Sequence, residues 1–292
     1  MATFTRPMTG LSLALALALS ACSSGGSPSP SQTMAPSGSP VPAAAVLLLR
    51  VTSEGGFINP AATIAALPTV VVYADGRILM AGTPSADNPH PLVVPAALRD
   101  VGASGAAAIQ AAIHAAGLDV ASTADPGVPG DSGVDVFDVV ANGVTVTTRF
   151  AGNGPGGPGL PGGGGDNPER AAALALLDRL LDPTETWGAA SAPQTVYQPV
   201  AYRVFAAPMA AGDGSASGAP AVAWPLATPL ASFGTPAVPD LGVTGLRSGV
   251  VYGADLDAFA RILAAAAGTT FSSGGQTYTL WVRALLPDEA TG

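Results

Sequence analysis

The amino-acid sequence predicts an α+β fold: a mostly antiparallel sheet made of hairpins, with about three interspersed helices. Strand patterns outnumber helix patterns along the chain. Two pairs of neighbouring strands are separated by Asp75-Gly76 and by Asn142-Gly143, dipeptides that favour tight hairpin turns. The helix patterns, at residues 103–116, 168–181 and 255–267, lie between strands rather than in one block.

The first strands surround a predicted hairpin. Residues 46–51 form a short apolar run that is typical of a buried strand. Residues 69–73 and 78–80 flank the turn Ala74-Asp75-Gly76-Arg77, where glycine supplies a positive backbone φ. A further strand is expected at residues 92–94, after a polar stretch rich in proline. These segments begin the predicted sheet.

The same order recurs further along the chain. The first helix, 103–116, carries alanine and isoleucine at helical spacing, with Ser104 as its expected N-cap and Gly117 as its end. Strands at 134–141 and 144–150 then form the second hairpin, and another helix follows them. Two hairpin-plus-helix units are therefore one interpretation of this order.

The rest of the chain adds helices and shorter strands. The helix at 168–181 has Asp166 or Asn167 as its expected cap, with Pro168 in its first turn. Strand patterns cover residues 200–206, 221–224, 249–253 and 277–285, and the last helix pattern covers 255–267.

The first 21 residues have the pattern of an export signal. Arg6 and the amino terminus give it a positive start, and residues 11–19 form an apolar core too short to span a membrane stably. Leu19-Ser20-Ala21-Cys22 resembles the lipobox of bacterial lipoproteins, in which a cysteine sulfur receives diacylglycerol before signal peptidase II cuts ahead of it. We therefore expect residues 1–21 to be removed and Cys22 to carry the lipid, palmitate included, that anchors the mature protein.

Downstream of this signal the composition changes twice. Residues 22–44 are rich in serine, proline and glycine, lack apolar periodicity and are expected to act as a tether. The exported globular α+β domain is expected to cover residues 45–292, with a subdivision near residue 190 left open. Residues 152–165 form a glycine- and proline-rich loop within it, for which a flexible connection is the expected role.

Composition excludes several classes of function. The chain has a formal net charge of −9, no lysine and no cluster of arginines. We therefore expect no binding to nucleic acid, because that affinity comes largely from basic groups that displace counterions. Without lysine, Schiff-base enzymes, Walker-type phosphate loops and serine–lysine hydrolases are excluded. Because Cys22 is the only cysteine, an intrachain disulfide and cysteine-rich zinc sites are excluded as well.

Two histidines are the candidate bases. His90 lies between prolines in a loop with Asp87 nearby, which makes it the stronger candidate. His114 lies in the alanine-rich helix, where a surface or half-buried imidazole is the simpler interpretation. No G-x-S-x-G nucleophile elbow accompanies either histidine. We therefore predict no catalytic residue and keep His90 as the alternative.

Carboxylates suggest a calcium or glycosidase site, but their spacing does not support one. Asp125, Asp131 and Asp135 lack the alternating oxygen ligands and the terminal glutamate of an EF-hand loop. Asp255 and Asp257 stand where a helix N-terminus ordinarily attracts acids, so that helix explains them. We predict no metal ligand in either group.

Two further patterns have structural explanations. Residues 154–159 match the dinucleotide pattern G-x-G-x-x-G formally, but they carry proline where backbone donors are needed. Trp187, Trp224 and Trp281 fall in three separate segments, which is typical of core or edge packing rather than of a sugar-binding platform. We therefore expect no cofactor.

Several motifs together resemble a known group of proteins. Beside the lipobox they are Val46-Leu47-Leu48-Leu49-Arg50-Val51, Gly55-Gly56-Phe57, Leu67-Pro68-Thr69, Tyr73-Ala74-Asp75-Gly76-Arg77 and Leu285-Leu286-Pro287-Asp288-Glu289. Over most of the chain this combination looks like uncharacterised actinobacterial lipoproteins. The resemblance implies a location in the cell envelope, and it brings no activity and no site residues.

Three functional interpretations follow from these patterns. The leading one is a lipid-anchored, non-catalytic binding or interaction module on the extracytoplasmic face of the cell membrane, with a small ligand or an envelope protein as its partner. One alternative is an envelope hydrolase that uses scattered carboxylates or His90. The other is a solute-binding subunit of a transporter, for which longer alternating strand–helix units are expected. An enzyme is the less favoured class.

Overall fold

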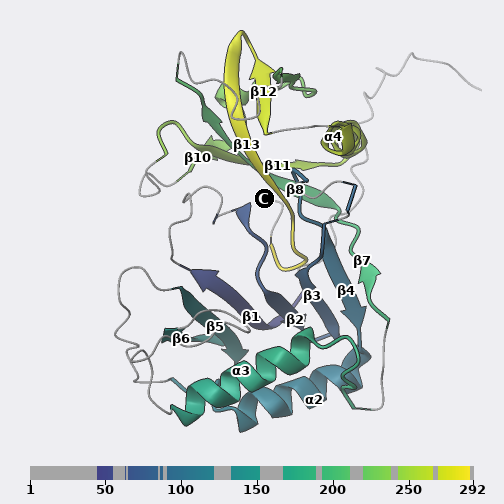
Figure 1. Cartoon of the computed structure of the whole chain (residues 1–292), viewed down its shortest axis with the longest axis vertical. Coiled ribbons are helices and arrows are strands. Elements are labelled where there is room, and N and C mark those ends of the chain that lie inside the picture. Colours follow the sequence, from purple (N-terminus) through teal and green to yellow (C-terminus); the bar gives the residue numbers. More distant parts are fainter. Residues whose placement is uncertain are drawn as a thin grey trace, which may run out of the picture. The chain divides into compact units, whose positions relative to one another are not determined.

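The computed structural model describes residues 45–54, 63, 65–84, 86–87, 91–121, 133–151, 167–188, 193–210, 220–237, 243–265 and 269–289. Within these residues the chain forms two mostly antiparallel sheets with helices packed against them (Figure 1). The predicted α+β class is therefore confirmed, with strands as the dominant element. The strands form two sheets, where the sequence led us to expect one.

The first sheet has seven strands and contains both predicted hairpins. Its order is β6-β5-β1-β2-β3-β4-β7, and every neighbouring pair is antiparallel. β1 lies between the β2–β3 and β5–β6 hairpins and joins them in one sheet. The strands are β1 (Leu47–Glu54), β2 (Val70–Tyr73), β3 (Arg77–Ala81), β4 (Ala96–Asp100), β5 (Val134–Ala141), β6 (Val144–Ala151) and β7 (Thr195–Val196).

Turns with positive φ close both hairpins, as predicted. In the β2–β3 turn Gly76 has a φ of 95°, and its N–H donates to the carbonyl oxygen of Tyr73 at 3.0 Å. In the β5–β6 turn Asn142 and Gly143 have φ values of 53° and 77°. Two successive left-handed residues match the right-handed twist of the flanking strands, which is why such turns suit two-residue hairpins.

The prediction of a strand at residues 92–94 is wrong. Those residues form no strand, and Leu92 and Val93 pack against the core of the second sheet. The fourth strand is β4, which pairs with β3 along its whole length. Its sequence, Ala-Ala-Leu-Arg-Asp, has little β propensity. Pairing with a neighbouring strand, rather than local preference, therefore makes these residues a strand.

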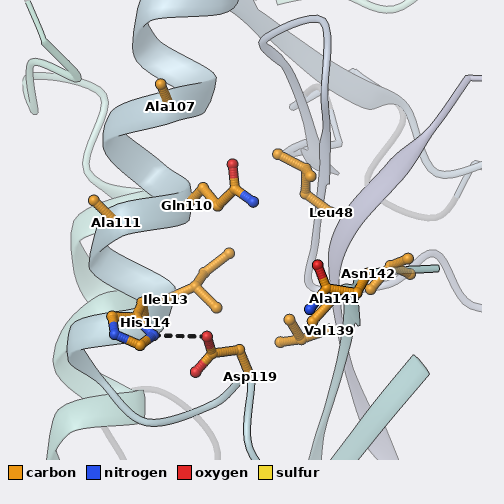
Figure 2. Close-up of a pocket in the computed structure, with 11 residues that line it drawn as sticks. Leu48, Ala107, Gln110, Ala111, Ile113, His114, Asp119, Val139, Ala141 and Asn142 are labelled. Carbon is orange, nitrogen blue, oxygen red and sulfur yellow. Dashed lines mark hydrogen bonds and ion pairs between the residues drawn. The ribbon is translucent and has the colours of Figure 1, made fainter. Parts of the chain in front are cut away.

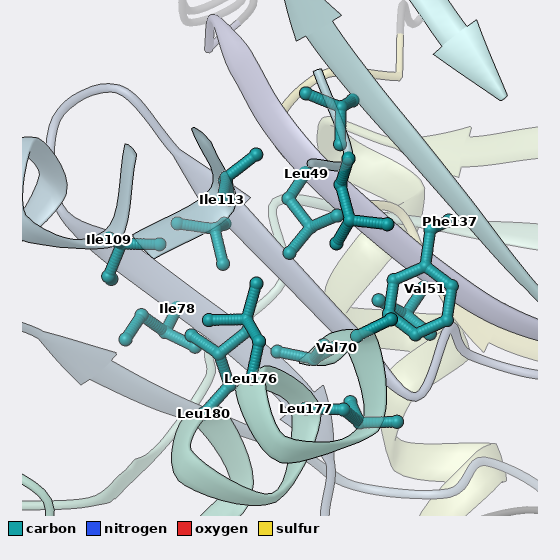
Figure 3. Packing of buried hydrophobic residues seen from close by; sticks show 14 of the residues in the cluster. Leu49, Val51, Val70, Ile78, Ile109, Ile113, Phe137, Leu176, Leu177 and Leu180 are labelled. Carbon is teal, nitrogen blue, oxygen red and sulfur yellow. The ribbon is translucent and has the colours of Figure 1, made fainter. Parts of the chain in front are cut away.

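Helices α2 (Gly102–Ala115) and α3 (Pro168–Leu181) cover one face of the first sheet (Figure 1). They bury their apolar sides against the strands, and this contact forms the main core of the sheet. Figure 3 shows the residues that meet there: Ile109 and Ile113 from α2, Leu176, Leu177 and Leu180 from α3, and Leu49, Val51, Val70, Ile78 and Phe137 from the strands.

Helix α3 begins as the sequence predicts. The side-chain oxygen of Asn167 accepts hydrogen bonds from the backbone N–H groups of Glu169 and Arg170, at 2.9 and 3.2 Å. Pro168 occupies the first turn, where a missing N–H costs nothing. Of the two expected caps, Asn167 is therefore the residue that caps the helix.

Helix α2 begins two residues before the predicted cap. Ser104 lies inside its first turn, and the side chain of the residue that precedes the helix, Val101, makes no capping hydrogen bond. Asp100 supplies the acceptor instead, because its Oδ1 receives the N–H of Gly102 at 3.0 Å. Gly117 ends the helix with a φ of 70°, as predicted.

The second sheet has six strands in the order β10-β11-β8-β13-β12-β9. All of its pairs are antiparallel except β12 with β9. Its core is aromatic: Trp224 meets Phe233, Phe259 and Phe271 edge-on, at ring distances of 5.4, 5.5 and 6.4 Å. Its elements are β8 (Ala201–Pro208), β9 (Val222–Ala223), a 3₁₀ turn (Leu230–Ser232), β10 (Thr235–Pro236), β11 (Arg247–Tyr252), α4 (Ala254–Ala265), β12 (Thr270–Ser273) and β13 (Gln276–Ala284).

Residues 285–289, which we call the C-terminal clasp, connect β13 to the first sheet. Within the clasp, Glu289 accepts hydrogen bonds from both terminal nitrogens of Arg283. Asp288 accepts from the guanidinium of Arg50 on β1 and, at 2.7 Å, from the hydroxyl of Tyr73 on β2. Leu286 is buried in an apolar cluster that contains Tyr73. One turn of chain therefore contacts both sheets.

Burial and the positive charge of Arg283 act in opposite directions on the pKa of Glu289 in the clasp. Burial alone would raise the pKa of Glu289, but the hydrogen bonds and positive charge of Arg283 outweigh it and hold that pKa below its ordinary value. Burial raises the pKa of the Tyr73 hydroxyl well above its usual range, and the hydrogen bond to Asp288 raises it further. Tyr73 is thus a permanent donor and Glu289 a permanent acceptor at neutral pH.

Candidate functional site

A groove runs between helix α2 and the β5–β6 hairpin. Its volume is about 430 Å³, within the range of small-molecule sites. Figure 2 shows Gln110 and Ile113 of the helix facing Leu48 and Val139 of the sheet across it. The other lining residues are Ala107, Ala111, His114, Asp119, Val140, Ala141 and Asn142.

The sequence of α2 explains why a groove exists here. Ala107, Gln110, Ala111 and His114 stand at positions i, i+3, i+4 and i+7, so they form one stripe along the helix. The two alanines are exposed and carry only a methyl group, so they add little bulk to the helix side of the groove. Gln110 and His114 add polar groups on the same stripe, one turn apart.

The end of α2 places a carboxylate beside this stripe. The N–H of Gly117 donates to the carbonyl of His114, and the N–H of Leu118 donates to the carbonyl of Ile113. This is a Schellman motif, in which a left-handed glycine reverses the chain and the next residue returns to the core. Leu118 is buried accordingly. Asp119 follows it directly and so comes to lie next to the last helical turn.

His114 and Asp119 form a hydrogen-bonded pair at one end of the groove. Nδ1 of His114 lies 2.7 Å from Oδ2 of Asp119. The side chain of His114 is 78% exposed and that of Asp119 is 25% exposed. Within the described residues, Oδ1 of Asp119 is buried and has no hydrogen-bond partner. The pair leaves Nε2 of His114 available to another molecule.

The lining has the chemistry of a binding site. Its polar groups are one imidazole, one carboxylate and the carboxamides of Gln110 and Asn142, set among aliphatic side chains. It contains no serine, threonine, cysteine or tyrosine that could attack a substrate covalently. Among the described residues, no three His, Cys, Asp or Glu side chains gather closely enough to hold a metal ion.

Several residues that the sequence singled out lie outside the described residues. They are Cys22 and the rest of the export signal and tether, His90, Asp125, Asp131 and the glycine-rich loop with its G-x-G-x-x-G match. Asp87, the expected neighbour of His90, is exposed. Asp135 is buried on β5, where its Oδ1 accepts a hydrogen bond from the hydroxyl of Ser53 at 2.9 Å. That contact is structural.

The remaining candidates have the structural roles that we expected. Asp255 and Asp257 lie in the first turn of α4, where acids favour a helix N-terminus. Trp187 and Trp224 are buried, and Trp281 on β13 is partly buried. The sequence did not predict the pairing of His114 with Asp119. A signal for it existed in Gly117-Leu118, which indicates a helix end that returns to the core.

No protein-family model, curated protein or solved structure matches this chain. Within the described residues, no helix is both long and apolar enough to cross a membrane.

Proposed function

We propose that this chain is a lipid-anchored extracytoplasmic binding protein and that the groove beside α2 holds a small ligand. The observation that carries the proposal is the groove itself, which combines hydrogen-bonding groups with aliphatic walls and lacks a covalent nucleophile. The export signal, lipobox and tether of the sequence support the location. The short turn between Asn142 and Val144 supports a preformed site, because it fixes one rim of the groove.

Different residues of the groove lining supply apolar contact and hydrogen bonds. Leu48 is partly exposed and supplies apolar surface, whose burial contributes roughly 25 cal/mol per Å², whereas Ile113 and Val139 are buried and form the floor of the groove. Gln110 and Asn142 present both donors and acceptors, which orient a ligand and discriminate against a wrong one.

A steric variant tests the groove. Ala111→Leu enlarges an exposed residue of the groove lining, whereas Ala103→Leu makes the same change at an exposed position of α2 outside the lining. Saturation-transfer NMR with a set of small polar and amphipathic compounds should return the same ligands for the wild type and Ala103→Leu, and lose them for Ala111→Leu. Ligands that bind all three proteins equally would contradict a site in the groove.

A second variant tests the anchor. Full-length wild-type protein, produced in a bacterial host, is expected to incorporate labelled palmitate and to enter the detergent phase of a phase-separation assay. Cys22→Ser should incorporate none and remain in the aqueous phase, because a hydroxyl does not form the thioether. Equal partitioning of the two proteins would contradict the anchor.

One observation favours an envelope hydrolase as the second candidate. A histidine whose Nδ1 contacts a carboxylate is the arrangement of a general base, and His114 has it at 2.7 Å. Hydrolysis of p-nitrophenyl acetate that is lost in His114→Ala would support this function, and loss in His90→Ala and Asp87→Ala would support the alternative based on His90. The third interpretation, a solute-binding subunit, has no support in the described antiparallel sheets.

A further inference from the structure

We infer that strand β6, an open edge of the first sheet, pairs with β6 of a second copy of this chain. The two strands run antiparallel about a two-fold axis, so the first sheets of the two copies join into one continuous sheet. This inference does not depend on the ligand groove. It rests on the openness of this edge, on the sequence of the strand and on the fit of the edge to itself.

In the described part of the chain, three of the four sheet edges are too short to hold another strand. β7, β9 and β10 have two residues each, and β10 includes Pro236, which has no N–H to donate. The fourth edge is β6, which has eight residues and lies at one end of the first sheet (Figure 1). It pairs with β5 along its whole length without a bulge that would twist the edge away.

Alternate residues of β6 direct their backbone groups away from β5. The two-residue turn makes Ala141 and Val144 a hydrogen-bonded pair, and such pairs recur at every second residue of an antiparallel ladder. The residues between them carry the outward N–H and C=O groups: Thr145, Thr147, Arg149 and Ala151. The side chains of the first three are exposed. An antiparallel strand laid along this edge can therefore exchange two hydrogen bonds with each of them.

The composition of the chain shows which strand suits this edge. Residues 23–44 and 152–165 are rich in proline and glycine, which remove ladder donors or weaken a strand. Residues 144–148 of β6 read Val-Thr-Val-Thr-Thr, and all five are β-branched. A second β6 therefore matches the edge in both length and β propensity.

Charge selects one register for the pair, in which Thr147 lies opposite Thr147 of the second copy. Thr145 then lies opposite Arg149, a pairing that contains no like charges, and threonine pairs are favourable at such positions. A shift toward Ala151 brings the two Arg149 side chains diagonal or opposite to each other, and they repel. A shift the other way leaves Arg149 opposite the turn residue Gly143, outside the strand.

In this register both faces of the joined sheet gain contacts. Val144, which is 64% exposed, comes to lie opposite Phe150 of the second copy, so the pair covers an exposed apolar side chain. On the other face Arg149 lies diagonal to Thr147, whose hydroxyl donates to Asp138 at 2.6 Å. Arg149 is free to turn toward that carboxylate, because its present ion pair with Glu54 is half-exposed and contributes little.

Engineered cysteines test the register, because Cys22 is the only cysteine of the chain. Full-length variants are oxidised with copper phenanthroline in suspensions of producing cells broken without detergent, and dimers are measured on non-reducing gels. Thr147→Cys places two thiols opposite each other at a Cα separation of about 5.5 Å, which a disulfide can bridge. It should give at least about fivefold more dimer than the wild type.

Thr145→Cys and Arg149→Cys are the matched controls. In each, the two thiols are four residues apart along the pair, about 13 Å, so neither variant should exceed the wild type. The double variant Thr145→Cys/Arg149→Cys brings unlike positions opposite each other and should form as much dimer as Thr147→Cys. Equal dimer from all three single variants would indicate random collision or parallel pairing and would overturn the inference.

A charge at the centre of the edge gives a second test. Thr147→Lys, added to the double-cysteine variant, sets two ammonium groups opposite each other and should lower the dimer yield at least about fivefold. Thr195→Lys makes the same change at an exposed position of the β7 edge and should leave the yield unchanged. An unchanged yield with Thr147→Lys, or no dimer in any cysteine variant, would also overturn the inference.

Discussion

Gly76 and Gly143 stand in corresponding hairpin turns, and both have positive φ values, yet their surroundings differ. A Cβ atom at Gly76 would lie 2.2 Å from the carbonyl oxygen of Gly102, whereas a Cβ at Gly143 meets nothing within 4 Å. We expect Gly143→Ala to lower the free energy of unfolding by about 1–2 kcal/mol, the cost of a left-handed alanine. Gly76→Ala must also displace backbone, so we expect a loss above about 4 kcal/mol.

Equilibrium urea unfolding, followed by tryptophan fluorescence, compares these two variants directly. Because both substitutions add the same methyl group at a positive φ, their difference isolates the contact with Gly102. Equal losses of stability would show that the start of α2 moves away from the turn at little cost.

Arg99 is the largest of the buried polar or charged side chains in the part of the chain that the structure describes, and it is 0% exposed. Its two terminal nitrogens donate to the carbonyl oxygens of Asp182 and Glu185, each at 2.7 Å, so β4 is tied to the segment after α3. Arg99→Leu removes both donors, and we expect it to cost about 2–4 kcal/mol in the free energy of unfolding.

The exposed Arg261 on α4 provides the control for this prediction. Its Nε donates to the carbonyl of Asp257 at 3.2 Å, and Arg261→Leu should change stability by less than about 0.5 kcal/mol. Thermal unfolding of both variants measures the difference. A similar small effect at position 99 would mean that water replaces the lost donors.

Among the elements, helix α3 depends on its cap. Asn167→Ala removes the acceptor for the N–H groups of Glu169 and Arg170, and we expect it to destabilise the protein by about 1 kcal/mol. Asn167→Asp keeps the oxygen and adds a favourable charge at the helix N-terminus, so it should match or exceed the wild type. Urea unfolding decides the order, and an Asn167→Asp variant as unstable as Asn167→Ala would argue against the cap.

The elements with strong local signals were predictable from the sequence. Both hairpins and helix α3 agree with it closely, because turn glycines, apolar alternation and a proline after a capping residue are local features. Strand β4 was not predictable, since its five residues become a strand through pairing with β3. The two-residue strands β7, β9 and β10 are also products of pairing.

In the candidate site, too, the local features could be predicted from the sequence and the features set by long-range packing could not. The helix with His114 and its end at Gly117 were predictable, and with them the polar and small residues of the α2 stripe. The groove was not, because its other wall comes from residues 139–142, which follow a long intervening segment. Which side of a sheet a helix covers depends on sheet order, and sheet order is not written in any local pattern.

At the scale of the whole molecule, the C-terminal clasp makes stability depend on pH. The pKa of Glu289 lies below its ordinary value of about 4.3, so its contribution is fully present above that pH and is lost as the pH falls through the folded-state pKa. We expect Glu289→Gln to be less stable than the wild type by about 1–3 kcal/mol at pH 7, and to converge with it as the pH falls through the lowered folded-state pKa of Glu289.

Urea unfolding at a series of pH values measures this convergence. Asp87→Asn, which removes an exposed carboxylate far in sequence from the clasp, serves as the control and should follow the wild-type curve. A difference between Glu289→Gln and the wild type that stays constant down to the pH at which the wild type itself unfolds would show that the pair with Arg283 does not respond to acid.

The position of β13 in its sheet has a consequence for folding during translation. This strand follows all of its partners in sequence, yet it lies in the interior of its sheet, between β8 and β12. A nascent chain can complete the first sheet as soon as β7 has emerged, whereas β8 must wait with one edge unpaired until translation has passed residue 284. A premature stop anywhere before β13 should therefore still allow the strands of the first sheet to pair. The second sheet would keep unpaired strand edges and exposed apolar side chains, which quality-control proteases recognise.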